Sequence, residues 1–310
     1  MKLSRIFGLV IILALTACIG VKPAVQTSLP ISSPVEESAS PTFLPAATTE
    51  STPVQDPVST LEPISGTSPA VDTPCQEEKG STQFYSLPVP RTQDEISGRI
   101  YTPPCYGANL DQKYPTLYLL HGATETDRQW DDLGIDEYAD DLINSGHISP
   151  LIIIMPKENS WISLPENPFG DYLVKYLVPW VDTHYQTRVD RKFRAIGGLS
   201  RGGNWAVRIG FLNWGMFSSV GVHSSPLFMG DLERIHGWFD VIPESKIPRI
   251  YLDVGGDDAD LENAAALEIQ LTRLGIPHSW HQYPGLHEES YWQNHLGEYL
   301  IWYSSGWGDE

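Results

Sequence analysis

The sequence is poor in basic residues, in cysteine and in long apolar runs. It has 20 Lys and Arg against 39 Asp and Glu, which gives a formal net charge of −19 at pH 7. Because proteins bind nucleic acids by neutralising phosphates with Lys and Arg, this balance argues against a nucleic-acid partner. The apolar run Ile6–Leu15 is too short for an ordinary membrane span. No internal repeat is present, so a repeat architecture is not expected either.

The first 18 residues have the pattern of an export signal. Lys2 and Arg5 precede the apolar run, which ends in the string LTAC at residues 15–18. This ending resembles the bacterial lipobox, in which the cysteine is lipidated and becomes the new N-terminus. The alternative is an ordinary secretory signal in which the cysteine stands by chance. The resemblance implies an extracytoplasmic lipoprotein, held at the membrane or cell surface only through Cys18.

Residues 19–74 are rich in Pro, Ser and Thr and nearly free of aromatic residues. Such a segment cannot bury enough apolar surface to offset its ordering entropy, so it is predicted to be a disordered linker. Folded structure is expected from residue 75 to residue 310. In an exported protein, Cys75 and Cys105 are predicted to form a disulfide across the start of this domain.

The folded part alternates strand and helix patterns. We expect an antiparallel strand pair at 83–90 and 97–106, and buried strands at 114–122, 149–156, 193–198, 217–224, 249–256 and 278–284. Helices are expected at 134–148, 169–185, 201–213, 260–275 and 288–305, the second of which must bend at Pro179. This alternation predicts one α/β domain, with a mostly parallel central sheet and helices on both faces.

The string GLSRG at 198–202 fits G-x-S-x-G, a strand-to-helix turn that exposes a nucleophilic serine. The preceding strand and the following helix supply the context that the motif requires. A phosphate-binding loop is excluded, because glycines at 197, 198, 202 and 203 match neither phosphate-binding spacing. Ser200 is therefore the candidate nucleophile, and it needs a base to remove its proton.

An acid should follow the serine, at the end of a later strand. Asp258 is preferred because it resembles a G-x-x-D pattern that begins at Gly255, and Asp257 is the second choice. For both residues the alternative is that they cap the helix that starts near Leu261. A calcium loop is not expected, because Asp258, Asp260 and Glu262 lack the glycine that such a loop needs.

A histidine should follow the acid, and His287 is the candidate base. It lies in a loop directly before a helix, whereas His281 falls within a strand pattern and His295 within the last helix. The string HEESY at 287–291 is no zinc motif, because Tyr291 stands where the second histidine would be. Neither a metal nor a cofactor is expected.

Ester or amide chemistry also needs hydrogen-bond donors for a developing oxyanion. The backbone N–H of Arg201 is one candidate, and that of Ala123, just after the strand at 114–122, is the second. His121 is expected to be a structural hydrogen-bonding residue and no second base. Candidates for the pocket wall, with ordinary packing as the alternative, are Trp130, Trp161 and Trp205.

Together these strings resemble the putative-esterase family of α/β-hydrolases, from about Gln83 to Trp302. Its members include feruloyl and acetylxylan esterases, S-formylglutathione hydrolase, enterochelin-type esterases and mycolyltransferases. The resemblance implies Ser200, Asp258 and His287 as the catalytic triad, with an oxyanion hole at Ala123 and Arg201. The loop after the string HG differs from the glycine-rich loop of many feruloyl members.

The resemblance implies a serine carboxylesterase that acts on a small-molecule or polysaccharide ester, such as a feruloyl ester. An acyltransferase of the mycolyltransferase type, in which an alcohol replaces water, is the alternative within the same chemistry. An amidase or peptidase is also compatible with a triad. A lipid-anchored binding protein on an inactive scaffold would lack a triad residue, and none is missing here.

Overall fold

The computed structural model describes residues 75–159, 161–162 and 166–308. The chain divides into two units, Met1–Ser68 and Pro69–Glu310, and every described residue belongs to the second. The predicted signal segment with Cys18 and the predicted linker at 19–74 lie outside the described residues. Among the helices that are described, none has both the length and the apolarity needed to cross a bilayer.

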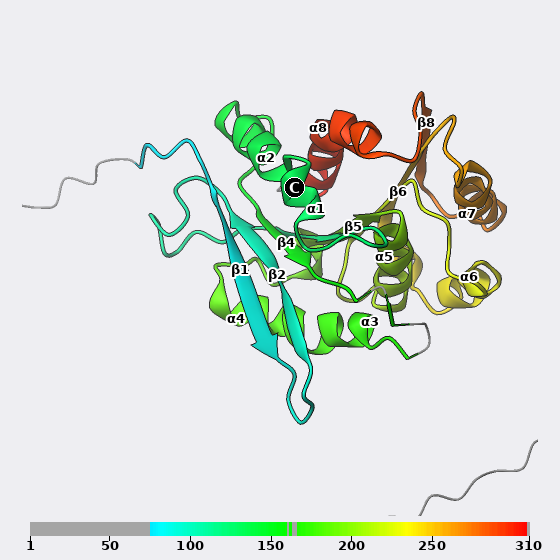
Figure 1. Cartoon of the computed structure of the whole chain (residues 1–310), viewed down its shortest axis with the longest axis horizontal. Coiled ribbons are helices and arrows are strands. Elements are labelled where there is room, and N and C mark those ends of the chain that lie inside the picture. Colours follow the sequence, from blue (N-terminus) through cyan, green and yellow to red (C-terminus); the bar gives the residue numbers. More distant parts are fainter. Residues whose placement is uncertain (1–74, 160, 163–165, 309–310) are drawn as a thin grey trace, which may run out of the picture. The chain divides into compact units, whose positions relative to one another are not determined.

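Eight strands form one sheet in the spatial order β1-β2-β4-β3-β5-β6-β7-β8 (Figure 1). β1 pairs with β2 and β2 with β4 in antiparallel register, and every later pairing is parallel. The prediction of a mostly parallel sheet with an antiparallel pair is confirmed. The strand bounds are β1 Ser81–Pro88, β2 Glu95–Thr102, β3 Thr116–Leu120, β4 Ile152–Pro156, β5 Arg194–Leu199, β6 Ser219–His223, β7 Arg249–Gly255 and β8 Ser279–Tyr283.

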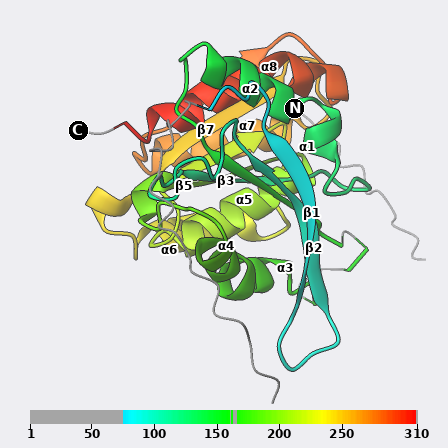
Figure 2. The same cartoon turned by 90° about the vertical axis from the view of Figure 1, so that its left-hand side faces the viewer.

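Helices cover both faces of this sheet, as the alternating sequence pattern predicts (Figures 1 and 2). One face packs against α1 (Gln129–Asp132), α2 (Ile135–Asn144) and α8 (Glu289–Ser305). The other face packs against α3 (Phe169–Tyr172), α4 (Val178–His184), α5 (Arg201–Leu212), α6 (Asp231–Phe239) and α7 (Leu261–Arg273). All residues of β3, β4, β5 and β6 are consequently buried, which explains their nearly continuous apolar sequences.

The segment at 169–185 departs from the single helix that its sequence predicts. It consists of α3, a π-helical turn η1 (Leu173–Leu177) and α4, in which Pro179 is the second residue. Proline has no N–H to donate, so the regular α-helical hydrogen-bond pattern is interrupted at Pro179. The wider hydrogen-bond spacing of the π turn before it allows the helical path to continue. Two further helices, α1 and α6, were not predicted from the sequence. α1 has only four residues, whereas α6 has nine, and its buried Ile235 and Phe239 recur at helical spacing. Short 3₁₀ turns, η2 (Arg191–Phe193) and η3 (Glu244–Lys246), complete the description.

Cys75 and Cys105 form the predicted disulfide, with a sequence separation of 30 residues. It ties the start of the domain to the segment that follows β2. A loop of this length implies a stabilisation of about 3 kcal/mol, mainly through restriction of the unfolded chain.

We therefore expect the Cys75→Ser/Cys105→Ser variant to lose about 3 kcal/mol of unfolding free energy while its kcat stays unchanged. Urea titration of both proteins measures this difference, and reductant should weaken the wild type alone. If reductant left the urea midpoint of wild-type unfolding unchanged, the expectation would be contradicted.

Candidate active site

Ser200 lies on the sharp turn between β5 and α5, with a φ of +50° that L-residues rarely adopt. A Cβ at Gly198 would lie 2.4 Å from the backbone carbon of Gly202, and a Cβ at Gly202 would lie 2.1 Å from the carbonyl oxygen of Leu120. Only glycine fits at either position, which is the reason for the G-x-S-x-G spacing. The turn that the motif predicts is therefore present.

The end of β6 holds this turn from the other side. The Ser200 N–H donates to the carbonyl of His223 at 2.9 Å, and the Ser225 hydroxyl donates to the carbonyl of Ser200 at 2.6 Å. Both polar groups of the Ser200 peptide are thus fixed by residues 223–225. This bracing keeps an uncommon backbone conformation in place, and nothing in the sequence alone indicated it.

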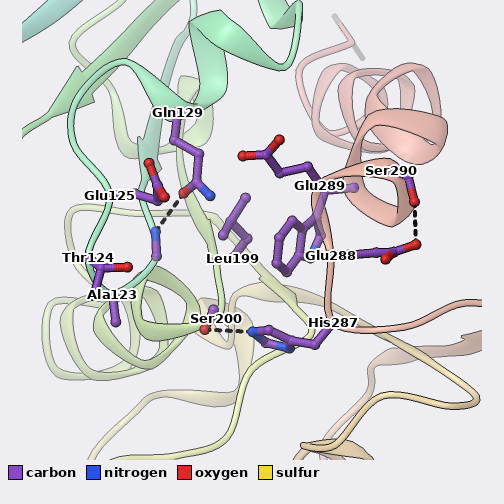
Figure 3. Close-up of a pocket in the computed structure, with 12 residues that line it drawn as sticks. Ala123, Thr124, Glu125, Gln129, Leu199, Ser200, His287, Glu288, Glu289 and Ser290 are labelled. Carbon is purple, nitrogen blue, oxygen red and sulfur yellow. Dashed lines mark hydrogen bonds between the residues drawn. The ribbon is translucent and has the colours of Figure 1, made fainter.

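Ser200, His287 and Asp258 come together at the carboxyl ends of β5, β7 and β8. The Ser200 Oγ lies 3.0 Å from Nε2 of His287 (Figure 3), and Nδ1 of His287 lies 3.0 and 3.1 Å from the two oxygens of Asp258. The Asp258 side chain is fully buried, and that of His287 is 28% exposed. A carboxylate at Nδ1 favours a proton there and leaves Nε2 able to accept one from a hydroxyl.

The neighbouring carboxylates take other positions. Asp257 is exposed and its side chain has no hydrogen bond within the described residues. Asp258 also accepts from the N–H of Asp260 at 2.7 Å, but Asp260 is itself the N-cap residue of α7, so neither Asp257 nor Asp258 caps that helix. Asp260, Asp258 and His287 offer ligand atoms within 4.8 Å of one another, a spacing that suits a metal ion, but Nδ1 of His287 already contacts Asp258.

The loop after β3 lies beside Ser200 and is held by buried polar contacts. Gln129 accepts the N–H of Gly122 through Oε1 at 2.8 Å. His121 accepts the N–H of Glu158 through Nε2 at 2.8 Å, and its Nδ1 contacts the Gly122 carbonyl at 2.8 Å. Burial lowers the pKa of His121, which favours the neutral ring that this pattern requires. His121 therefore has the structural role that the sequence predicts.

The backbone N–H groups of Ala123 and Arg201 donate no hydrogen bond to any other described residue. Ala123 lines the cavity above Ser200, and Arg201 directly follows Ser200 in the chain. Both N–H groups are therefore available to donate a hydrogen bond, which is what the predicted oxyanion hole requires.

A cavity of about 620 Å³ opens above Ser200 (Figure 3). None of the three candidate tryptophans lies in its wall: Trp130 and Trp205 are buried in the core, which is the ordinary packing given as the alternative, and Trp161 is 86% exposed and lines an adjoining cavity. Trp292, five residues after His287, lines the cavity instead. The lining residues are Gly122, Ala123, Thr124, Glu125, Gln129, Leu199, Ser200, His287, Glu288, Glu289, Ser290 and Trp292.

A buried carboxylate, Asp253 on β7, lies beneath the site and has no part in the contacts above. It accepts hydrogen bonds from His223 Nδ1 at 2.6 Å, the Tyr291 hydroxyl at 2.7 Å and the Tyr299 hydroxyl at 2.8 Å. Burial and the Asp253 charge raise the pKa of both tyrosines, so both hydroxyls stay protonated and donate. The ring of Tyr291 also packs against Gly285, two residues before His287.

This arrangement gives a matched pair of variants. Tyr291→Phe and Tyr299→Phe each remove one hydroxyl from Asp253, and each should cost about 1.5–3 kcal/mol of unfolding free energy. Tyr291 also packs against the loop that carries His287, so we expect Tyr291→Phe to lower kcat by roughly fivefold with KM unchanged, and Tyr299→Phe to leave kcat unchanged. Chemical denaturation and steady-state kinetics provide the two readouts. Equal kcat values for the two variants would disprove the link to His287.

An eight-stranded, mostly parallel sheet with a serine on the turn after β5 and an acid and a histidine after β7 and β8 defines an α/β-hydrolase. The chain belongs to the family described as "Putative esterase", which it matches over residues 90–303.

Two relatives match part of the chain. An esterase of Mycobacterium tuberculosis strain H37Rv is 32% identical over 153 residues, which cover 46% of this chain and 31% of the relative. An endo-1,4-beta-xylanase/feruloyl esterase of Xylanibacter ruminicola is 31% identical over 144 residues, 43% of this chain and 20% of the relative. The chain thus matches less than a third of the length of either relative.

Solved structures share the fold. A ferulic acid esterase superposes with a TM-score of 0.66 at 23% identity and covers 74% of this chain and 99% of its own. An S-formylglutathione hydrolase from Agrobacterium tumefaciens superposes with a TM-score of 0.61 at 16% identity and covers 75% of this chain and 98% of its own. These likenesses establish the architecture alone.

Proposed function

We propose that the protein is a serine esterase that hydrolyses carboxylic esters at Ser200. The observation that carries this proposal is the chain of contacts from the Ser200 hydroxyl through His287 to the buried Asp258, at the base of a 620 Å³ cavity. Membership of the esterase family supports it. The roles of the individual residues follow from general ester chemistry.

In the proposed mechanism the Ser200 Oγ attacks the ester carbonyl carbon while Nε2 of His287 takes the hydroxyl proton. The amides of Ala123 and Arg201 donate to the tetrahedral oxyanion. His287 then gives its proton to the leaving alcohol, and an acyl-Ser200 ester remains. Water repeats the cycle, with His287 again as the base, and releases the carboxylic acid. Asp258 holds the imidazole and stabilises its positive charge.

The proposed natural substrates are esters in which an acyl group, such as feruloyl, is linked to a polysaccharide. This class of substrate is supported by the 31% identical relative that is named an endo-1,4-beta-xylanase/feruloyl esterase. A panel of acetyl, butyryl, feruloyl and thioester substrates tests the proposal, together with labelling of Ser200 by a fluorophosphonate. Lack of turnover of every ester and lack of labelling would refute it. New esters formed when sugar or lipid acceptors are added would instead identify an acyltransferase.

We also propose that the protein is exported and anchored through a lipid on Cys18. The string LTAC at 15–18 supports this proposal. Cells fed radiolabelled palmitate should incorporate label into the wild type, and none into Cys18→Ser. Equal labelling of the two proteins would contradict the lipid site.

A further inference from the structure

The cavity above Ser200 contains more negative charge than the proposed chemistry uses. Glu125, Glu288 and Glu289 all line it, and no Lys or Arg is among its described lining residues. Neither Glu125 nor Glu289 has an ion-pair partner within 4.0 Å in the described part of the chain. Unpaired carboxylates in a concave site create a negative potential there.

The two neighbouring glutamates at the start of α8 behave differently. The hydroxyl of Ser290 donates to Glu288 at 2.6 Å, and Figure 3 shows the Glu288 carboxylate turned toward Ser290. The Glu289 carboxylate points instead toward the side of the cavity that carries Gln129 (Figure 3). Glu289 is therefore the α8 carboxylate that a ligand in the cavity would meet.

Gln129 gives a second, independent indication of a ligand. The residue is only 5% exposed, and its Oε1 is engaged by the N–H of Gly122. Its Nε2 donates to no described residue and points into the cavity in Figure 3. Because this N–H faces the cavity from a nearly buried residue, an oxygen of a ligand bound there can accept its hydrogen bond.

Two basic side chains close to this site, Lys157 and Arg201, form no ion pair with the glutamates that line the cavity. Lys157 lines the adjoining cavity together with Glu125, but forms no ion pair with it within 4.0 Å. Arg201 is engaged by the buried Glu158 in a two-pronged ion pair, with both distances at 2.9 Å. The guanidinium charge next to the nucleophile is therefore already neutralised.

We propose that this cavity selects esters by charge: it favours an ester whose alcohol part carries an ammonium group and rejects one whose alcohol part carries a carboxylate or phosphate. Glu125 and Glu289 attract the cation, and Nε2 of Gln129 donates to an oxygen of the ester. The alcohol side is chosen because Glu289 lies two residues after His287, the group that protonates the leaving alcohol. This inference rests on the proposed esterase function.

Three acetate esters of similar size test it with the full-length protein: acetylcholine, its uncharged isostere 3,3-dimethylbutyl acetate, and 4-acetoxybutanoate. Acetate release measures kcat/KM. At low ionic strength we expect the cationic ester to exceed the neutral one by about tenfold, and the neutral one to exceed the anionic one similarly. In 0.5 M NaCl both ratios should shrink, because salt screens partly exposed charges.

Variants then assign the effect to residues. Glu125→Gln/Glu289→Gln should bring the cationic-to-neutral ratio to within about twofold of unity. Glu288→Gln removes the same charge one residue away and should keep at least half of the wild-type ratio. Gln129→Glu retains an acceptor for Gly122 but loses the donor, so it should lower kcat/KM for the neutral ester by about tenfold.

Each outcome decides the proposal. Cationic and neutral rates within twofold in the wild type, or a preference that survives Glu125→Gln/Glu289→Gln, would overturn charge selection and leave the esterase assignment intact. A loss in Glu288→Gln equal to that in the double variant would refute the assignment to Glu289. If the protein hydrolyses none of the three esters and Ser200 resists fluorophosphonate, the esterase assignment falls and this inference with it.

Discussion

Ser200→Ala is expected to lower kcat for p-nitrophenyl acetate by about 10⁵-fold or more, while the fold persists. The variant keeps the Cβ and removes only the oxygen that would attack the ester. The backbone clamp from His223 remains, because it binds the Ser200 N–H and no side-chain atom. Any acceleration that remains relative to the uncatalysed hydrolysis in water would come from substrate binding and the oxyanion donors alone.

Stopped assays with purified protein measure this loss, and circular dichroism with thermal melts checks the fold. Ser86→Ala, an exposed serine on the edge strand β1, is the matched control and should retain wild-type kcat. Undiminished turnover by Ser200→Ala would end the serine-esterase proposal, whatever the comparisons with other proteins suggest.

Asp258→Asn is expected to lower kcat by about 10⁴-fold, with little change in KM. An asparagine amide at Nδ1 of His287 no longer fixes the proton there, and the imidazolium that forms during attack loses its counter-charge. Asp257→Asn removes an identical group one residue away, from an exposed side chain without partners among the described residues. That variant should stay within about twofold of wild type.

The two variants decide between the acids that the sequence left open. Steady-state assays of both variants at several pH values distinguish the two acids. Loss of the carboxylate that orients His287 should change the pH profile of kcat as well as its magnitude. A large loss in Asp257→Asn with a small one in Asp258→Asn would reverse the assignment. Asp260 has its Oδ2 3.9 Å from Nδ1 of His287. If Asp258→Asn retains some activity, Asp260 is the carboxylate that could orient His287 in its place.

Much of the fold was predictable because its signals are local. The apolar strings of β3, β4 and β5 reveal strands buried on both faces, and the glycines around Ser200 reveal the turn that joins β5 to α5. The 169–185 segment was predicted less well, because local pattern does not show how a chain passes a proline inside a helix. The four-residue helix α1 is too brief for a periodic signal, whereas α6 has one, in Ile235 and Phe239, that was not recognised in the sequence.

The cavity was the least predictable part. Three tryptophans were candidates for its wall, with ordinary packing as the alternative; two of them pack in the core and the third lines another cavity. The sequence does not distinguish an aromatic residue of the core from one of a pocket wall, because both environments bury apolar surface. Gln129, Glu289 and Asp253 were missed for a related reason: single polar residues at helix starts and in strands look alike until their partners are known.

The sequence by itself determined the order of the eight strands and of most helices along the chain, the glycine-framed turn at Ser200, and the candidates for acid and base. These properties depend on backbone sterics and on the periodicity of burial, both of which neighbouring residues set. Only the tertiary structure decided which aspartate faces His287, which glutamates line the cavity and what braces the turn from beneath. Those facts depend on distances between side chains far apart in the chain, which packing of the whole sheet and its helices fixes.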